Sequence, residues 1–122
     1  MRSGPREGVE AVCPFCKAAL YRPKELRLSA TEIVQGGVCK GCGAIYIMDP
    51  TGKNVGEIMR QGLGMAADRL GKDLIQMVAG EDYDEVVLHY DWRTHRSSGE
   101  AKGFLDRSGR LYVIKIKQKQ TE

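Results

Sequence analysis

The sequence predicts an α+β protein, and three observations lead to this fold class. Strand-like segments fill residues 9–50, one long amphipathic pattern follows, and strand-like segments return towards the C-terminus. The chain has 122 residues, of which 42% are hydrophobic and 29% are charged, as in an ordinary globular domain. We therefore expect two regions, residues 9–50 and residues 51–122, packed together as one unit.

The region 9–50 is predicted to consist of short β-strands. Residues 25–28 alternate between polar and apolar side chains, residues 32–34 include two β-branched side chains, and residues 44–48 are an apolar run typical of a strand. The two glycines at 36–37 are a hairpin turn signal. So short a region buries little apolar surface by itself, and a bound metal ion would add much of its stability.

The region 51–122 is predicted to begin with a long helix. Asn54 and Glu57 have the spacing of an N-terminal capping box, and the helical pattern continues to near Gly80. Ile58 and Met65 lie seven residues apart on the flank of the apolar face, where they could contact a partner chain or a second copy of the protein. The apolar face itself is formed by Val55, Met59, Leu63, Ala66, Ala67, Leu70, Leu74, Met77 and Val78.

Glycine is unfavourable in a helix interior by about 1 kcal/mol relative to alanine, and the predicted helix contains four glycines. Close packing against a sheet is the expected reason for Gly56, Gly62, Gly64 and Gly71.

Strands are predicted again at residues 86–92, 101–106 and 110–117, the last two as a hairpin. Residues 93–100 are predicted to be a polar connector. In the last strand, Tyr112, Ile114 and Ile116 fall on one face, and lysines fall on the other.

Four cysteines form two close pairs. Cys13 and Cys16 flank Pro14-Phe15, and Cys39 and Cys42 flank Lys40-Gly41, with 22 residues between the pairs. Each CxxC turn can direct two sulfur atoms towards one tetrahedral centre, and backbone N–H groups can donate to the thiolates. The sequence therefore predicts a closed site with Cys13, Cys16, Cys39 and Cys42 as ligands of one structural metal ion.

The segments CPFC and CKGCGA, set among short strands, resemble the knuckles of the zinc-ribbon superfamily. The resemblance covers the N-terminal third of the chain and implies a zinc ribbon with one structural Zn²⁺. Zinc-ribbon knuckles have a glycine after the second cysteine, and Gly43 fits this pattern whereas Lys17 departs from it.

Two other interpretations of the cysteines are possible. CPFC also resembles the active-site tetrad of glutaredoxin-like proteins, but that tetrad precedes a helix, whereas Pro23 leaves little room for one here. A four-cysteine site is also similar to that of rubredoxin, so iron and electron transfer are the alternative to zinc. Because a closed four-sulfur zinc site offers no open coordination position, we expect a protein that is not an enzyme.

The C-terminal part is basic, since residues 93–122 contain eight lysines and arginines but three acidic side chains. Aromatic side chains at positions 92, 104 and 112 lie among them, a combination typical of surfaces that bind single-stranded nucleic acid or RNA. A solvated strand face explains the same pattern, and lysines at a sheet edge deter strand pairing. The candidate nucleic-acid-binding residues are Arg93, Arg96, Arg110, Lys115, Lys117 and Lys119.

Other features suggest no catalytic site. His89 is expected in a strand and His95 in solvent, and neither has a companion at metal-binding spacing. No apolar run is long enough to span a membrane, so the expected location is the cytoplasm. The predicted function is a small zinc-containing binding or adaptor module, with a protein or a nucleic acid as its partner.

Overall fold

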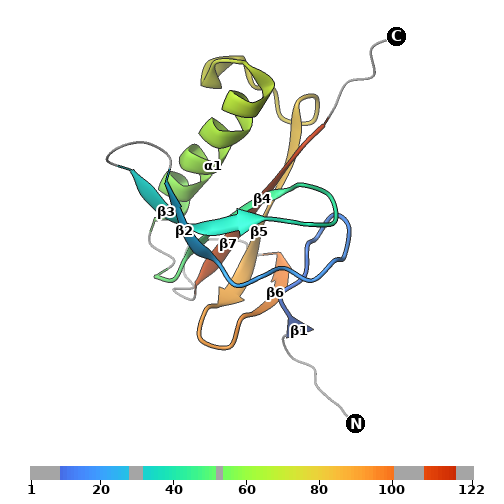
Figure 1. Cartoon of the computed structure of the whole chain (residues 1–122), viewed down its shortest axis with the longest axis vertical. Helices are drawn as coiled ribbons and strands as arrows, with labels where there is room; N and C mark the ends of the chain where they lie inside the picture. Colours follow the sequence, from blue (N-terminus) through green and yellow to red (C-terminus); the bar gives the residue numbers. More distant parts are fainter. Residues whose placement is uncertain (1–8, 28–31, 52–53, 101–108, 118–122) are drawn as a thin grey trace.

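The computed structural model describes residues 9–27, 32–51, 54–100 and 109–117. In these residues one antiparallel sheet of seven strands is accompanied by a 16-residue α-helix, which confirms the predicted α+β class (Figure 1). The elements in chain order are β1 (Val9–Glu10), β2 (Lys24–Arg27), β3 (Ile33–Val38), β4 (Ile45–Asp49), α1 (Val55–Leu70), the 3₁₀ helix η1 (Leu74–Gln76), β5 (Tyr83–Asp91), β6 (Arg96–Glu100) and β7 (Arg110–Ile116).

The last strand joins the two regions of the chain. The sheet order is β1-β6-β5-β7-β4-β3-β2, so β7 lies between β5 and β4. Tyr112 pairs with Ile47 of β4 on one side and with Val87 of β5 on the other. Residues 9–50 and 51–122 therefore contribute strands to one continuous sheet.

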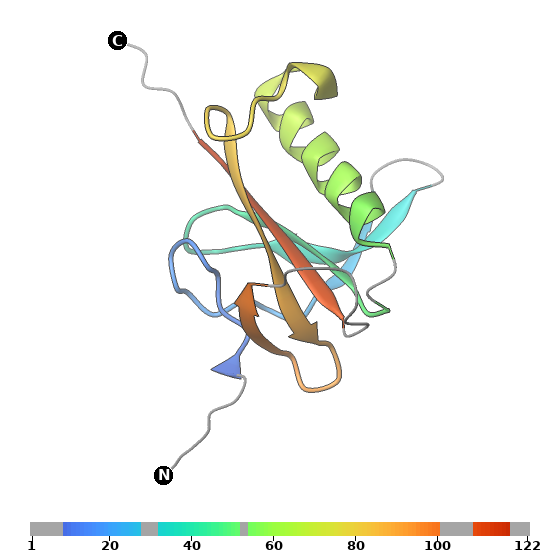
Figure 2. The ribbon, with the colours of Figure 1, turned by 180° about the vertical axis from the view of Figure 1, so that it is seen from behind.

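The two faces of this sheet bury different groups of side chains. On β4 and β7 the residues Ile45, Ile47, Tyr112 and Ile114 face α1, as the alternation in β7 predicts. The opposite face buries Tyr46, Leu111 and Val113 together with two of the cysteines. Figure 2 shows α1 on one side of β7 and the cysteine-bearing loops on the other.

The helix lies close to the sheet at one glycine. A Cβ atom added at Gly62 would lie 2.6 Å from Cε2 of Tyr112, so only glycine allows this approach. This confirms the packing explanation for Gly62, whereas Gly56 and Gly64 have no atom within 4 Å of such a Cβ.

Ile58 and Met65 do not form an exposed partner surface. Ile58 is 6% exposed and belongs to the core between α1 and the sheet, and Met65 packs against the same core partly buried. The buried residues of α1 are Ile58, Gly62, Ala66 and Ala67, so the buried face includes Ile58, which the sequence placed on the flank.

The predicted helix end near Gly80 is wrong. Gly71 takes a left-handed conformation (φ 69°), its N–H donates to Asp68 O, and the N–H of Lys72 donates to Ala67 O. This pair of bonds is a Schellman C-cap, which ends α1 at Leu70. Leu74 and Val78 are consequently exposed rather than on the buried face.

The predicted capping box is also absent. Asn54 makes no side-chain capping bond, and Glu57 instead binds Arg60 at 2.6 Å. The buried carboxylate of Asp49 accepts from the N–H of Asn54 at 2.6 Å and of Thr51 at 3.1 Å, and so holds the turn that precedes the helix.

Two other local predictions differ from the structure. Gly36 and Gly37 lie inside β3 rather than in a turn, and glycine is needed there because a Cβ atom would collide with the backbone or the ring of Tyr46. The predicted connector at 93–100 contains the strand β6. The predicted strand at 101–106 lies outside the described residues.

No helix in the described part of the chain has the length and apolar character needed to cross a membrane.

Candidate metal centre

The two cysteine pairs lie in turns with the same backbone hydrogen bonds. In the first knuckle, residues 13–18, the N–H of Lys17 donates to Cys13 O at 2.9 Å and the N–H of Cys13 donates to Ala18 O at 2.8 Å. The second knuckle, residues 39–44, repeats both bonds, Gly43 N–H to Cys39 O at 2.8 Å and Cys39 N–H to Ala44 O at 2.7 Å. The glycine missing from the first knuckle does not change its form, because Lys17 adopts φ 69° where Gly43 has φ 83°.

These turns bring the four sulfur atoms together. The Sγ atoms of Cys13 and Cys42 are 3.6 Å apart, as are those of Cys16 and Cys39, and all four lie within 4.8 Å of one another. Tetrahedral coordination with metal–sulfur bonds near 2.3 Å places sulfur atoms about 3.8 Å apart. The four-cysteine cluster can therefore hold one metal ion.

Backbone N–H groups are directed at the sulfur atoms, as metal thiolates require. The N–H of Gly41 donates to Cys39 Sγ at 3.3 Å. A backbone N–H of Ala18 lowers the pKa of Cys16 to about 7, whereas burial raises the pKa of Cys42 to about 12. Burial thus disfavours the thiolate form of Cys42, a cost that a bound cation would offset.

The sheet positions both knuckles. The second is the turn between β3 and β4, and the first follows β1 and is closed by a bridge between Val12 and Ala19. Cys13 and Cys39 are buried in the core of this face, whereas Cys16 is exposed. Figure 1 shows the two loops side by side, away from α1.

His95 holds the first knuckle against the sheet, which sequence reasoning missed. It is 6% exposed rather than solvated, with Nε2 at 2.6 Å from Leu20 O and Nδ1 at 2.7 Å from the Tyr90 hydroxyl. A carbonyl only accepts, so Nε2 bears a proton and donates to Leu20 O, while Nδ1 shares a hydrogen bond with the Tyr90 hydroxyl. His95 has a left-handed backbone conformation (φ 58°), and no local sequence pattern indicates it. With both nitrogens engaged, His95 is not a metal ligand.

The basic residues proposed as a nucleic-acid surface are not brought together. Arg110 is 3% exposed, and the Tyr112 ring is fully buried. Arg93 lies in the turn after β5 and Arg96 at the start of β6, near the start of β7. Lys115 lies five residues further along β7 than Arg110, about 17 Å from it. Lys117 is exposed near Lys115, and Lys119 lies outside the described residues.

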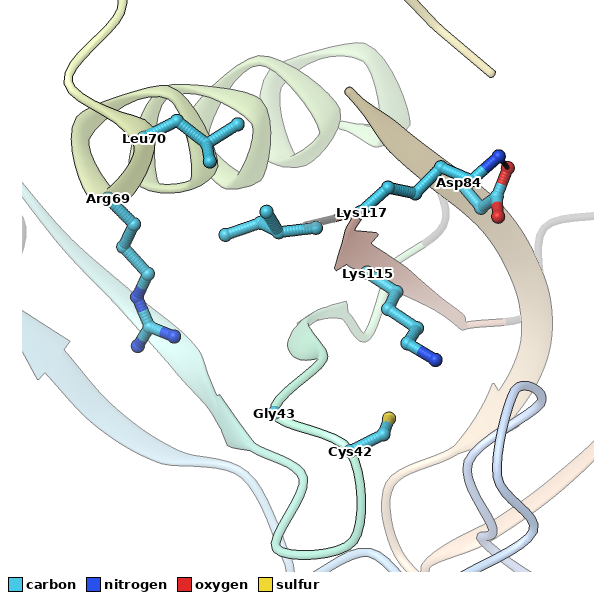
Figure 3. A pocket seen from close by; sticks show the side chains of 8 residues that line it. Cys42, Gly43, Arg69, Leu70, Asp84, Lys115 and Lys117 are labelled. Atoms are coloured by element: carbon cyan, nitrogen blue, oxygen red, sulfur yellow. Dashed lines mark ion pairs between the residues drawn. The ribbon is translucent and has the colours of Figure 1, made fainter. Parts of the chain in front are cut away.

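A pocket of about 650 Å³ lies between the second knuckle and the end of α1 (Figure 3). Its lining includes Cys42, Arg69, Lys115 and Lys117, and Figure 3 shows Lys115 extending towards Cys42. Lys117 donates to Gly80 O at 2.8 Å and lies 3.7 Å from a carboxylate oxygen of Asp84. Lys115 thus extends towards the cluster, whereas the ammonium of Lys117 is engaged elsewhere.

Comparison with known proteins gives no relative. No protein-family model matches the chain, no curated protein matches it, and no solved structure matches it. The function must therefore be argued from the cluster and its surroundings.

Proposed function

We propose that the chain is a non-enzymatic binding module organised by one structural zinc ion. The observation that supports this most directly is the approach of four sulfur atoms from two knuckles to within 4.8 Å of one another. Four sulfur ligands complete a tetrahedral shell, so a reactant would find no open position on the metal. The proposed role of the ion is to hold the knuckles on the sheet, as in a zinc ribbon.

The burial of the ligands supports a structural role. Cys13 and Cys39 are part of the core opposite α1, which also contains Ala11, Leu20 and Tyr46. Four thiolates with Zn²⁺ have a net charge of about −2, which backbone N–H groups of the knuckles, such as that of Gly41 on Cys39 Sγ, would partly offset. Zinc is the proposed metal because it prefers a closed four-sulfur shell without redox change, and iron is the alternative.

Dithiol chemistry is a less suitable function for this geometry. A redox pair needs a thiolate at the start of a helix or beside a cation and a second cysteine that can reach it. Here the CxxC turns lie between strand segments, and each short sulfur–sulfur distance joins a cysteine of one knuckle to a cysteine of the other. The proposed compartment is the cytoplasm, where such thiols stay reduced.

Metal analysis of the purified chain tests this proposal. We expect one zinc per chain, a colourless protein, and loss of zinc in Cys39→Ser and Cys42→Ser variants. A chelator should then lower the melting temperature of the wild-type chain but not of either variant. A fully folded chain with unchanged stability in the absence of any metal would refute the structural role. Visible absorption typical of iron thiolates would show that the bound metal is iron and not zinc.

A further inference from the structure

The structure brings exposed aromatic rings and cations from three segments of the chain to the flank of the knuckles. We call Tyr21, Arg22, Lys40, Trp92 and Arg93 the aromatic-cation surface. Tyr21 is 57% exposed and Trp92 is 46% exposed, although large aromatic side chains are usually buried. Only Trp92 and Arg93 of this set are among the aromatic and basic residues that the sequence singled out.

Short contacts and chain connectivity join these five residues. Lys40 Nζ lies 3.0 Å from the Tyr21 hydroxyl and 5.2 Å from the ring centroid. Arg22 Nη1 donates to Trp92 O at 3.1 Å, and the Arg93 guanidinium lies 5.9 Å from the Trp92 ring. The surface therefore runs from the tip of the second knuckle to the turn between β5 and β6.

The backbone beneath the rings is held by buried groups. The Tyr46 hydroxyl donates to Tyr21 O at 2.9 Å, and His95 Nε2 donates to the carbonyl of the preceding residue, Leu20, at 2.6 Å. Asp91 Oδ1 accepts from the N–H of Arg93 at 3.0 Å, which fixes the turn that presents Trp92. A surface ordered before binding loses less conformational entropy when a ligand arrives.

We propose that the aromatic-cation surface binds single-stranded nucleic acid. Bases stack on the exposed faces of Tyr21 and Trp92, and backbone phosphates pair with Arg22, Lys40 and Arg93. Each base has a π-face, so this recognition is tolerant of sequence, whereas a duplex hides those faces. An acidic peptide would satisfy the cations but would leave the ring faces unused.

This inference rests on the proposed function, because the metal-bound knuckles place Lys40 beside Tyr21. It differs from the surface predicted from the sequence, since buried Arg110 and buried Tyr112 have no part in it. Lys115 and Lys117 lie at the other end of β7 and are also excluded.

Trp92 is the single tryptophan of the chain, so its fluorescence reports directly on the surface. We would titrate the zinc-loaded protein at low salt with oligouridylate, oligodeoxythymidylate of equal length, duplex DNA and polyglutamate. Saturable quenching by either single strand, with weaker quenching by the duplex, supports the proposal, and a preference between the two strands identifies RNA or DNA as the ligand. Quenching by polyglutamate that equals quenching by both single strands would overturn it.

Variants separate stacking from charge. Binding of a labelled single strand, measured by anisotropy, should weaken about 5- to 150-fold in Trp92→Ala or Tyr21→Ala and much less in Trp92→Phe. Arg93→Gln should reduce the slope of log K against log salt by about 0.7. The matched control is Arg69→Gln, which alters an exposed arginine at the C-terminal end of α1, outside the aromatic-cation surface, and should leave affinity and slope unchanged.

Zinc content and circular dichroism of each variant keep the two proposals apart. A variant that retains zinc and fold but loses binding supports the interface. Equal affinity in wild type, Trp92→Ala and Tyr21→Ala would overturn the interface while leaving the structural zinc site intact. A wild-type chain that folds without metal would refute the zinc site instead.

Discussion

Lys17 and Gly43 occupy equivalent positions in the two knuckles, and both have a left-handed backbone, with φ values of 69° and 83°. A side chain with a Cβ atom is strained in this conformation by about 1–2 kcal/mol, whereas glycine is not. The N–H of each residue donates to the first cysteine of its knuckle, so the conformation is required by the turn and not by the residue.

Lys17→Gly should therefore stabilise the metal-loaded protein. We expect the free energy of unfolding to rise by about 0.5–1 kcal/mol, because relief of the strain exceeds the added entropy of the unfolded chain. Gly43→Ala should lower it by about 1–2 kcal/mol, since an added Cβ meets no atom within 4 Å and backbone strain is the main effect. Denaturant titration measures both, and Lys24→Gly in the exposed strand β2 is the control that should destabilise.

Removal of the metal should affect the two faces of the sheet unequally. The core beneath α1 contains no cysteine, whereas the opposite core contains Cys13 and Cys39. After chelation, amide hydrogen exchange should accelerate most in residues 11–20 and 38–44 and least in α1. Hydrogen exchange read by mass spectrometry tests this, and uniform acceleration over the whole chain would show that the metal supports both faces equally.

Gly62→Ala should destabilise the protein despite the higher helix propensity of alanine. The added Cβ would lie 2.6 Å from the Tyr112 ring, which is fully buried and cannot move away freely. We expect a loss of about 1–3 kcal/mol in the free energy of unfolding. Gly56→Ala on the same helix has open space and should gain about 0.4–1 kcal/mol. Gains of equal size in both variants would contradict the close contact.

His95→Ala should destabilise the protein by about 1–3 kcal/mol. The change leaves the buried Leu20 carbonyl and Tyr90 hydroxyl without their partner. Thermal unfolding of this variant should be compared with that of Thr94→Ala, which alters an exposed neighbour in the same turn. Equal melting temperatures would argue against a positioning role for the histidine.

Lys115→Gln should weaken zinc binding about 3-fold at low salt, because an ammonium directed towards Cys42 offsets the negative charge of the thiolates (Figure 3). Lys117→Gln is the control, since its ammonium binds Gly80 O at 2.8 Å instead. Competition with a chelator gives both affinities, and the difference should diminish as salt is added. Identical zinc affinities of the two variants would show that Lys115 does not interact with the thiolates.

The spacing of the cysteines was enough to predict the four-ligand cluster, because CxxC turns are local and two of them complete one tetrahedral shell. The helix start and the strands at 44–48 and 110–117 were also predictable, since their periodicity reflects which side chains are buried. The end of α1 was missed because apolar residues continue beyond Gly71, and only the backbone conformation of that glycine ends the helix.

The sequence by itself determined the four-cysteine cluster, the α+β class and the alternation of β7, because these follow from local spacing and periodicity. The tertiary structure decided which charged and aromatic residues reach the surface. Arg110 and Tyr112 are buried because β7 lies between β4 and β5, and Arg22 donates to Trp92 O across 70 residues of sequence. Pairing between strands that are distant in the sequence sets these positions, and local sequence patterns carry no information about that pairing.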